Sequence, residues 1–222
     1  PVDAALRVQR GPRGPLRVGR VERVHRQHAR TEPLPGQSAP LRGRVGTYDV
    51  ERSGVGYLFA TQDSQLGSIA GALLAALGDN HVRLEERTGV LLDRVSRGEL
   101  LLAYNVLGSY AQARIDAGAP LAIVQPEDYT LVALRTAVIP RDTPHAAEAR
   151  RFLDYLLSAR GQRVLSREAR LMPILPPDGD PHGAPRTFRP IALGPGLLVY
   201  LDALKRRQFL EAWRSSMRPP QD

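Results

Sequence analysis

Two short clusters of polar side chains have the residue types of a small-molecule binding site. They lie in the segments VGTYDVERSG (45–54) and AYNVLGSYA (103–111). Hydroxyl and amide groups make directional hydrogen bonds, so they can hold and orient a ligand. No catalytic constellation accompanies them, so the clusters predict binding without chemical change. The candidate ligand-binding residues are Thr47, Tyr48, Ser53, Asn105, Ser109 and Tyr110.

Each cluster follows a predicted strand and precedes a predicted helix. The strands are GRVGTYDV (43–50) and ELLLAYNV (99–106), and helical patterns begin after Ser53 and near Ser109. Helix N-termini carry unpaired N–H groups that favour anions, and ligands of α/β sheets bind beyond the carboxyl ends of strands. We therefore expect both junctions to face one cleft that binds a small anion. Either cluster also fits a structural alternative, with the serine as a helix cap and the tyrosine as a packed aromatic.

The sequence lacks the motifs of the common enzyme classes. There is no G-x-S-x-G, H-E-x-x-H or P-loop, and no G-x-G-x-x-G follows a strand. The five histidines are scattered, and the absence of cysteine excludes disulfides and thiolate metal sites. We therefore expect no enzymatic activity, no catalytic residues, no metal site and no cofactor.

The chain from residue 43 onward alternates between strand and helix patterns, which predicts an α/β fold. Asp63 or Ser64 fits the N-cap of one helix, Thr88 fits that of the next, and Thr143 with Pro144 fits a third start. Further helices are expected at 64–77, 88–97, 143–158, 161–169 and 197–217, and further strands at 120–126 and 129–140.

The N-terminal segment 1–43 differs in composition from the rest. Residues 1–44 hold ten arginines against three acidic residues, a net +7 of the total +8. Its Gly-Pro pairs interrupt any helix, so we expect a disordered basic segment and no nucleic-acid partner. A single lysine beside thirty arginines is typical of a GC-rich gene, so a non-native, out-of-frame segment is the alternative. A basic arm that binds nucleic acid is the third interpretation.

No stretch of 18 consecutive apolar residues is present, so we expect no membrane insertion. The sequence begins at Pro1 without a charged and then apolar leader, so we expect the signal peptide to lie outside it.

Five segments together resemble the bacterial periplasmic solute-binding proteins of ABC transporters. The similarity covers about residues 42–175 and points to the type 2 periplasmic-binding fold, in the branch of ferric-iron, phosphoglycerate and phosphonate binders. The segments are RGRVGTYD (42–49), GELLLAYNVLGSYA (98–111), PEDYTLV (126–132), ARRFLDYLLSARGQ (149–162) and LMPI (171–174).

The resemblance implies a two-lobed α/β protein that closes on its ligand and docks on a membrane permease in the periplasm. It implies that residues 44–128 form the second lobe. Residues 129–222 would hold the hinge return, a remnant of the first lobe and a C-terminal helix. The fold would then be incomplete at the N-terminus, because relatives place most of the first lobe before this point.

The resemblance places ligand contacts at the same six candidate residues. The iron binders carry adjacent tyrosines where this chain has Ser109-Tyr110. We therefore expect an organic carboxylate, a phosphonate or a phosphorylated compound rather than ferric iron. The expected function is the substrate-binding component of an ABC transporter. The alternative is a ligand-sensing module of a signalling or transcription-regulatory system with the same fold.

Overall fold

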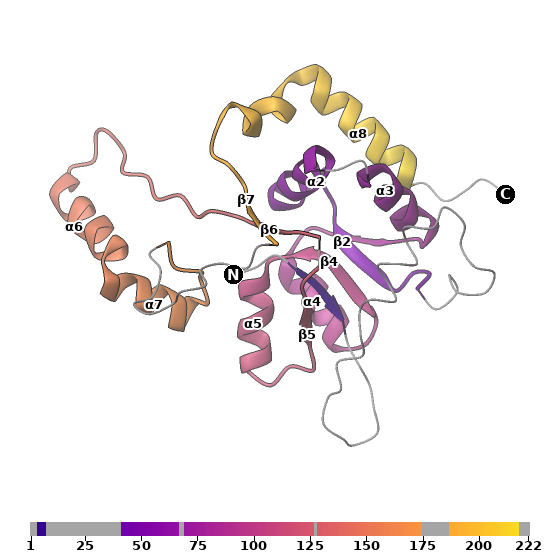
Figure 1. Ribbon diagram of the computed structural model, residues 1–222, viewed down its shortest axis with the longest axis horizontal. Coiled ribbons are helices and arrows are strands. Elements are labelled where there is room, and N and C mark those ends of the chain that lie inside the picture. The colour runs from indigo at the N-terminus through magenta and orange to yellow at the C-terminus, as the bar shows by residue number, and fades with distance from the viewer. Residues whose placement is uncertain (1–3, 8–40, 67–68, 127, 175–186, 218–222) are drawn as a thin grey trace.

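A five-stranded mixed β-sheet lies at the centre of the protein (Figure 1). Its strands stand in the order β3-β2-β4-β1-β5. Their bounds are Ala4–Arg7 for β1, Val45–Tyr48 for β2, Arg83–Glu85 for β3, Leu102–Val106 for β4 and Ala122–Val124 for β5. The computed structural model describes residues 4–7, 41–66, 69–126, 128–174 and 187–217.

The strand directions fit an α/β unit with one reversed strand. β2 runs parallel to both β3 and β4, whereas β1 runs antiparallel to β4 and β5. The strands expected at 43–50, 99–106 and 120–126 are confirmed, with bounds shifted by at most three residues. Short apolar runs, which are local in the sequence, are enough to locate them.

β1 comes from the segment 1–43, for which the composition predicted disorder or a non-native segment. Leu6 instead stands opposite Ala103 in β4 and Ile123 in β5. A strand at this place pairs with backbone N–H and C=O groups of two neighbours that would otherwise lack partners in the sheet. The expectation is therefore wrong for Ala4–Arg7. Residues 1–3 and 8–40 lie outside the described residues.

Helices cover both faces of the sheet. Figure 1 shows α2 and α3 on one side and α4 and α5 on the other. Their bounds are Gly54–Leu66, Ala70–Asp79, Thr88–Ser96 and Gly108–Asp116. The main core lies between these helices and the strands, and burial of its apolar surface is the dominant stabilising term. Its largest fully buried hydrophobic side chains are Tyr48, Phe59, Leu91, Leu92, Val95, Leu100 and Val106.

The C-terminal part adds a second, two-stranded sheet and a helix against the first unit. β6 (Thr130–Val132) pairs in parallel with β7 (Phe188–Pro190). A 3-10 helix, η1 (Pro195–Leu201), precedes α8 (Ala203–Met217), which packs against α3. The contact needs Gly78, because a Cβ at that position would stand 1.8 Å from the Ser216 carbonyl oxygen.

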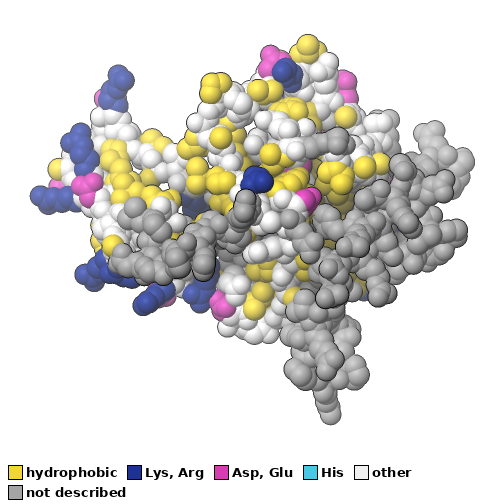
Figure 2. Space-filling view, in the orientation of Figure 1, with side chains coloured by type: hydrophobic (Ala, Val, Ile, Leu, Met, Phe, Trp, Pro, Cys, Tyr) yellow, Lys and Arg dark blue, Asp and Glu magenta, His cyan; other side chains and the backbone are white. Residues whose placement is uncertain are grey.

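The helices α6 (Ala146–Leu157) and α7 (Ala159–Ala169) form a hairpin that stands apart from the central sheet (Figure 1). None of the residues of α6 is buried. Phe152 is 62% exposed and Val164 is 43% exposed, and Figure 2 shows hydrophobic side chains beside Lys and Arg in this region. Within the described residues, the apolar face of this hairpin is therefore uncovered. The first-lobe assignment of this part stays a prediction.

Several expected boundaries are wrong. Thr88 is the first residue of α4 rather than its N-cap, which is Arg87. Thr143 and Pro144 lie before α6, whose N-cap is His145. Asp63 and Ser64 do not cap a helix but lie inside α2. The run 129–140 forms a strand only at Thr130–Val132, because its partner β7 spans three residues. The final helical stretch is interrupted at Asp202, whose carboxylate accepts the N–H groups of Leu204 and Lys205 at 3.1 and 3.0 Å. Asp202 thus ends the 3-10 helix and begins α8.

Candidate functional site

The two polar clusters meet at one edge of the central sheet. Because β2 and β4 are parallel neighbours, with Gly46 opposite Ala103, their carboxyl ends point the same way. The Thr47 hydroxyl donates a hydrogen bond of 3.2 Å to the Tyr104 carbonyl oxygen, which joins the two strand ends directly. The helices α2 and α5 begin shortly after these ends, at Gly54 and Gly108. Two helix N-termini therefore follow two adjacent strands.

The junction between β2 and α2 is closed by contacts within the protein. Thr47, Tyr48 and Ser53 are all buried, with exposed fractions of 4%, 1% and 6%. The Ser53 hydroxyl accepts the Gly56 N–H at 3.2 Å, as a helix cap does. The Tyr48 hydroxyl forms a hydrogen bond with the Thr88 hydroxyl at the start of α4. These polar groups are therefore satisfied by the fold itself.

The junction between β4 and α5 is more open. Tyr110 is 49% exposed, the largest exposure among the six candidate residues, whereas Ser109 is 7% exposed. Leu107 rather than Ser109 occupies the N-cap position of α5, and no side chain caps that helix. Asn105 has a backbone φ of 61°, in the left-handed region that few residues other than glycine adopt.

Asn105 lies in a β-bulge. Against β1, the register steps from Ala4 opposite Val106 to Leu6 opposite Ala103, so three steps on β4 face two on β1. Ala103 and Val106 are both completely buried, although residues three apart on a regular strand face opposite sides. Bulges of this kind re-aim side chains and occur often next to functional sites.

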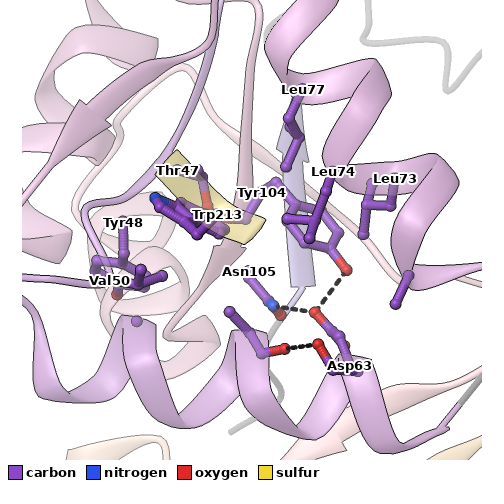
Figure 3. Close-up of a pocket in the computed structure, with 14 residues that line it drawn as sticks. Thr47, Tyr48, Val50, Asp63, Leu73, Leu74, Leu77, Tyr104, Asn105 and Trp213 are labelled. Atoms are coloured by element: carbon purple, nitrogen blue, oxygen red, sulfur yellow. Dashed lines mark hydrogen bonds between the residues drawn. The ribbon is translucent and has the colours of Figure 1, made fainter. Parts of the chain in front are cut away.

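A buried carboxylate receives the side chains that follow the bulge. Asp63, in the third turn of α2, is 5% exposed. Its Oδ2 accepts hydrogen bonds from the Tyr104 hydroxyl at 3.1 Å and from Asn105 Nδ2 at 2.7 Å (Figure 3). Its Oδ1 accepts a third from the Tyr129 hydroxyl at 2.8 Å. One side chain of α2 thus contacts β4 and the segment before β6.

The pKa values of Asp63 and of its tyrosine partners are raised. Burial raises the pKa of Asp63, and the hydrogen bonds from Tyr129, Tyr104 and Asn105 oppose part of this rise. Burial, followed by the charge of Asp63, raises the pKa of Tyr104 and of Tyr129. Both phenols therefore remain neutral donors at physiological pH, and the carboxylate is their shared acceptor.

Sequence reasoning gave Asp63 only the role of a helix cap, and it assigned no role to Tyr104 or Tyr129. A signal for Asp63 was available, because it lies on the buried face of α2 with Gly56 and Phe59 at helical spacing. A carboxylate on an apolar stripe needs partners. The sequence does not say which ones.

A small cavity beside Asp63 is not the ligand site in its present form. Its volume is about 20 Å³, which is room for about one water molecule. Figure 3 shows Asp63, Tyr104 and Asn105 on its polar side, close to the apolar side chains of α3. The apolar part of its lining includes Leu73, Leu74, Leu77 and Trp213.

An exposed ion pair stands at the same edge of the sheet. Arg52, in the loop between β2 and α2, lies 3.1 Å from Glu86, which follows β3. The Arg52 side chain is 68% exposed, so an anion could compete with Glu86 for it. Sequence reasoning missed Arg52 as well, although it stands between Thr47 and Ser53 in the first cluster.

Within the described residues, no group of three or more His, Cys, Asp or Glu side chains could hold a metal ion. No helix in that part of the chain has the length and apolar character needed to cross a membrane.

Comparison with known proteins adds the family. Residues 26–168 match the family of bacterial extracellular solute-binding proteins, a range that starts upstream of the expected residue 42. The phosphoglycerate transport regulatory protein PgtC of Salmonella typhimurium is 32% identical over 149 residues, which are 66% of this chain and 36% of PgtC. This chain therefore spans about a third of that relative's length.

Solved structures agree on the fold. The substrate-binding protein of an ABC transporter from Agrobacterium tumefaciens is 32% identical, with a TM-score of 0.68. The alignment covers 82% of this chain and 56% of that protein. The periplasmic binding protein AfuA of Actinobacillus pleuropneumoniae, at 18% identity and a TM-score of 0.54, supports the fold alone over 97% of this chain and 66% of AfuA.

These neighbours confirm the α/β fold of type 2 periplasmic binding proteins. The family match, which covers more than half of the chain, confirms the resemblance noted in the sequence. The chain belongs to the family of bacterial extracellular solute-binding proteins.

Proposed function

We propose that this chain is the substrate-binding component of an ABC transporter. It captures a small anionic solute in a cleft between two lobes, in the periplasm, and presents it to a membrane permease. The observation that carries this proposal is the meeting of two strand-to-helix junctions at one sheet edge, in a chain of the solute-binding family. Ligands of open α/β sheets bind at such edges.

The chemistry of the edge favours an anion. The N-termini of α2 and α5 direct backbone N–H groups and the positive ends of their dipoles toward it. Arg52 adds an exposed positive charge whose partner, Glu86, is also exposed. The relative at 32% identity is named for phosphoglycerate transport. We therefore place a phosphorylated carboxylate first, ahead of simple carboxylates and phosphonates.

The six candidate residues have different roles in this proposal. Tyr110 and Asn105 contact the ligand, because the first is half exposed and the second stands at the bulge. The other four are buried, and they hold the two helix starts and strand ends in place. They are Thr47, Tyr48, Ser53 and Ser109.

Titration calorimetry on the purified chain tests the proposal. The probes are 3-phosphoglycerate, inorganic phosphate, phosphonoacetate and ferric citrate. Tyr110→Phe removes one hydroxyl and should weaken binding of the best probe by about 10- to 100-fold, as expected for a hydrogen bond to a charged group. Tyr155→Phe is the matched control, because Tyr155 is 40% exposed on the distant helix α6.

Three results would each count against this proposal. Equal affinity of wild type and Tyr110→Phe removes Tyr110 from the site. Chemical conversion of the bound probe, measured by phosphorus NMR, contradicts a pure binding role. Binding of ferric citrate in preference to all the phosphorylated or carboxylate probes contradicts the ligand class.

A ligand-sensing role is the second candidate, and one observation favours it. The relative PgtC is named a transport regulatory protein. The two roles differ in what deletion of the gene does. A transport component is required for uptake of the labelled solute. A sensor is required for the transcriptional response to the solute, while uptake continues when the transporter is expressed from another promoter.

A further inference from the structure

We infer that Asp63 is a positioning residue for ligand binding: it holds Asn105 in the bulge of β4 and ties it to Tyr129, where the chain passes from the central sheet to β6. The inference rests on the proposed function, because it concerns the same sheet edge. It adds a residue that contacts no ligand and acts through Asn105.

The first step concerns the directions of two neighbouring side chains. Successive residues of a regular strand point to opposite faces of the sheet. Tyr104 and Asn105 are successive residues of β4, yet both donate to the same oxygen of Asp63. Only the bulge allows this, because the left-handed backbone at Asn105 turns its side chain toward α2.

The second step concerns what keeps Asn105 in this conformation. A left-handed backbone is unfavourable for residues with a Cβ, and it persists only where the surroundings enforce it. Asparagine tolerates it better than most residues, but its amide must still find partners when it leaves water. Asp63 supplies that partner at 2.7 Å, the shortest of its three hydrogen bonds.

The third step concerns the other carboxylate oxygen. Tyr129 stands directly before β6, and its own N–H is fixed by the Asp128 carboxylate at 2.8 Å. Its hydroxyl donates to Asp63 Oδ1 at 2.8 Å. Movement of the segment that leads to β6 would therefore displace Asp63, the residue that holds Asn105. Asp63 links the ligand junction to the connection between the two sheets.

The experiment compares three variants, with the removal of a similar hydroxyl as the control. Tyr129→Phe and Tyr104→Phe each remove one hydrogen bond to Asp63, and Asp63→Asn removes the carboxylate. Tyr57→Phe is the control, because the Tyr57 hydroxyl is also on α2 but donates to the Tyr200 carbonyl oxygen at 2.6 Å, outside this cluster. If Asp63→Asn does not fold, the two phenylalanine variants at Tyr104 and Tyr129 carry the test.

Amide hydrogen exchange without ligand is the first measurement. In the three Asp63-cluster variants, exchange should rise at least fivefold in peptides that cover 102–110 and less than twofold in α3. Tyr57→Phe should leave 102–110 within twofold of wild type. An equal rise in both regions would show a general loss of stability and overturn the inference. This measurement does not depend on whether the proposed ligand is correct.

Affinity for 3-phosphoglycerate is the second measurement, and it should fall at least fivefold in the cluster variants and less than twofold in Tyr57→Phe. Unchanged affinity in all three cluster variants overturns the positioning role. If wild type binds none of the probes, the proposed function fails, while the exchange data still decide the structural link.

A rescue experiment separates positioning from plain stabilisation. Glycine adopts the left-handed conformation without strain. In the Asp63→Asn or Tyr104→Phe background, Asn105→Gly should restore at least half of the lost protection in 102–110 if Asp63 acts by holding that conformation. A further loss of protection on adding glycine would contradict the inference.

Discussion

The two strand-to-helix junctions contain similar residues but are built differently. At the first, Thr47, Tyr48 and Ser53 are buried and have partners in the protein. At the second, Asn105 is in a left-handed bulge and Tyr110 is half exposed. The two junctions thus contain similar residue types at the same place in the topology, but they differ in solvent exposure. The first junction holds the sheet and helices together, and the second offers groups to a ligand.

The bulge is the physical cause of the difference. Tyr48 ends a strand that is buried along its whole length, so its ring continues into the core and its hydroxyl reaches Thr88. At β4 the extra residue shifts the alternation of side chains, so that Tyr104 and Asn105 are both drawn to Asp63. The following turn then leaves Tyr110 on the outside of α5.

The largest expected effect is on stability, at Tyr48. Tyr48→Ala should lower the free energy of unfolding by about 3–5 kcal/mol, because a fully buried aromatic ring is lost and a cavity remains. Tyr110→Ala, the same change at the exposed junction, should cost less than about 1 kcal/mol. Urea unfolding followed by circular dichroism measures both. Similar losses of unfolding free energy at Tyr48 and Tyr110 would show that the two junctions do not differ in their contribution to stability.

Much of the fold could be predicted from the sequence, and little of the site. The strands at 45–48 and 102–106 were located because their apolar residues are consecutive in the chain. Asp63 was mistaken for a helix cap because its partners are 41, 42 and 66 residues away. The bulge needs β1, which lies about a hundred residues upstream in a segment with a disordered composition. Local sequence patterns do not reveal pairings between residues so far apart in the chain.

The next effect concerns the bulge itself. Asn105→Ala removes the hydrogen bond to Asp63. It also places alanine at a φ of 61°, a left-handed conformation that alanine tolerates less well than asparagine does. We expect a loss of about 2–3 kcal/mol in unfolding free energy. Asn105→Gly loses the same hydrogen bond without the strain, so it should be more stable than the alanine variant by about 1 kcal/mol. A glycine variant less stable than alanine would contradict the left-handed assignment.

A smaller effect follows from the raised pKa of Asp63. Because burial raises its pKa in the folded state above the ordinary 3.8, the folded protein binds this proton more tightly than the unfolded chain does. The contribution of Asp63 to stability is therefore greatest below about pH 3.8 and is lost as the pH rises through the folded-state pKa.

The measurement for this effect is the difference in unfolding free energy between wild type and Asp63→Asn. This difference should decrease as the pH rises from about 3.5 to 7. Asp116→Asn should show the opposite pH dependence, because hydrogen bonds from Gln112 and Arg170 lower the pKa of that exposed carboxyl. The difference in unfolding free energy between wild type and Asp116→Asn should therefore increase as the pH rises. A wild-type advantage over Asp63→Asn that grows with pH would show that the hydrogen bonds outweigh burial.

The smallest expected effect on stability is at Arg52, and it tests whether the first junction contributes charge to the site. The Arg52–Glu86 pair is exposed on both sides, and such pairs add little to stability. Arg52→Gln should therefore leave the urea midpoint close to that of wild type.

The effect of Arg52→Gln on anion binding should be larger, because the positive charge lies beside the N-terminus of α2. We expect about fivefold weaker binding of 3-phosphoglycerate at low salt, and a smaller difference at about 0.5 M salt, where charges are screened. Arg97→Gln is the matched control, because the exposed Arg97–Glu99 pair follows α4 and precedes β4, at the opposite end of that strand from Asn105. Equal affinity for wild type and both arginine variants would confine ligand contact to the junction between β4 and α5.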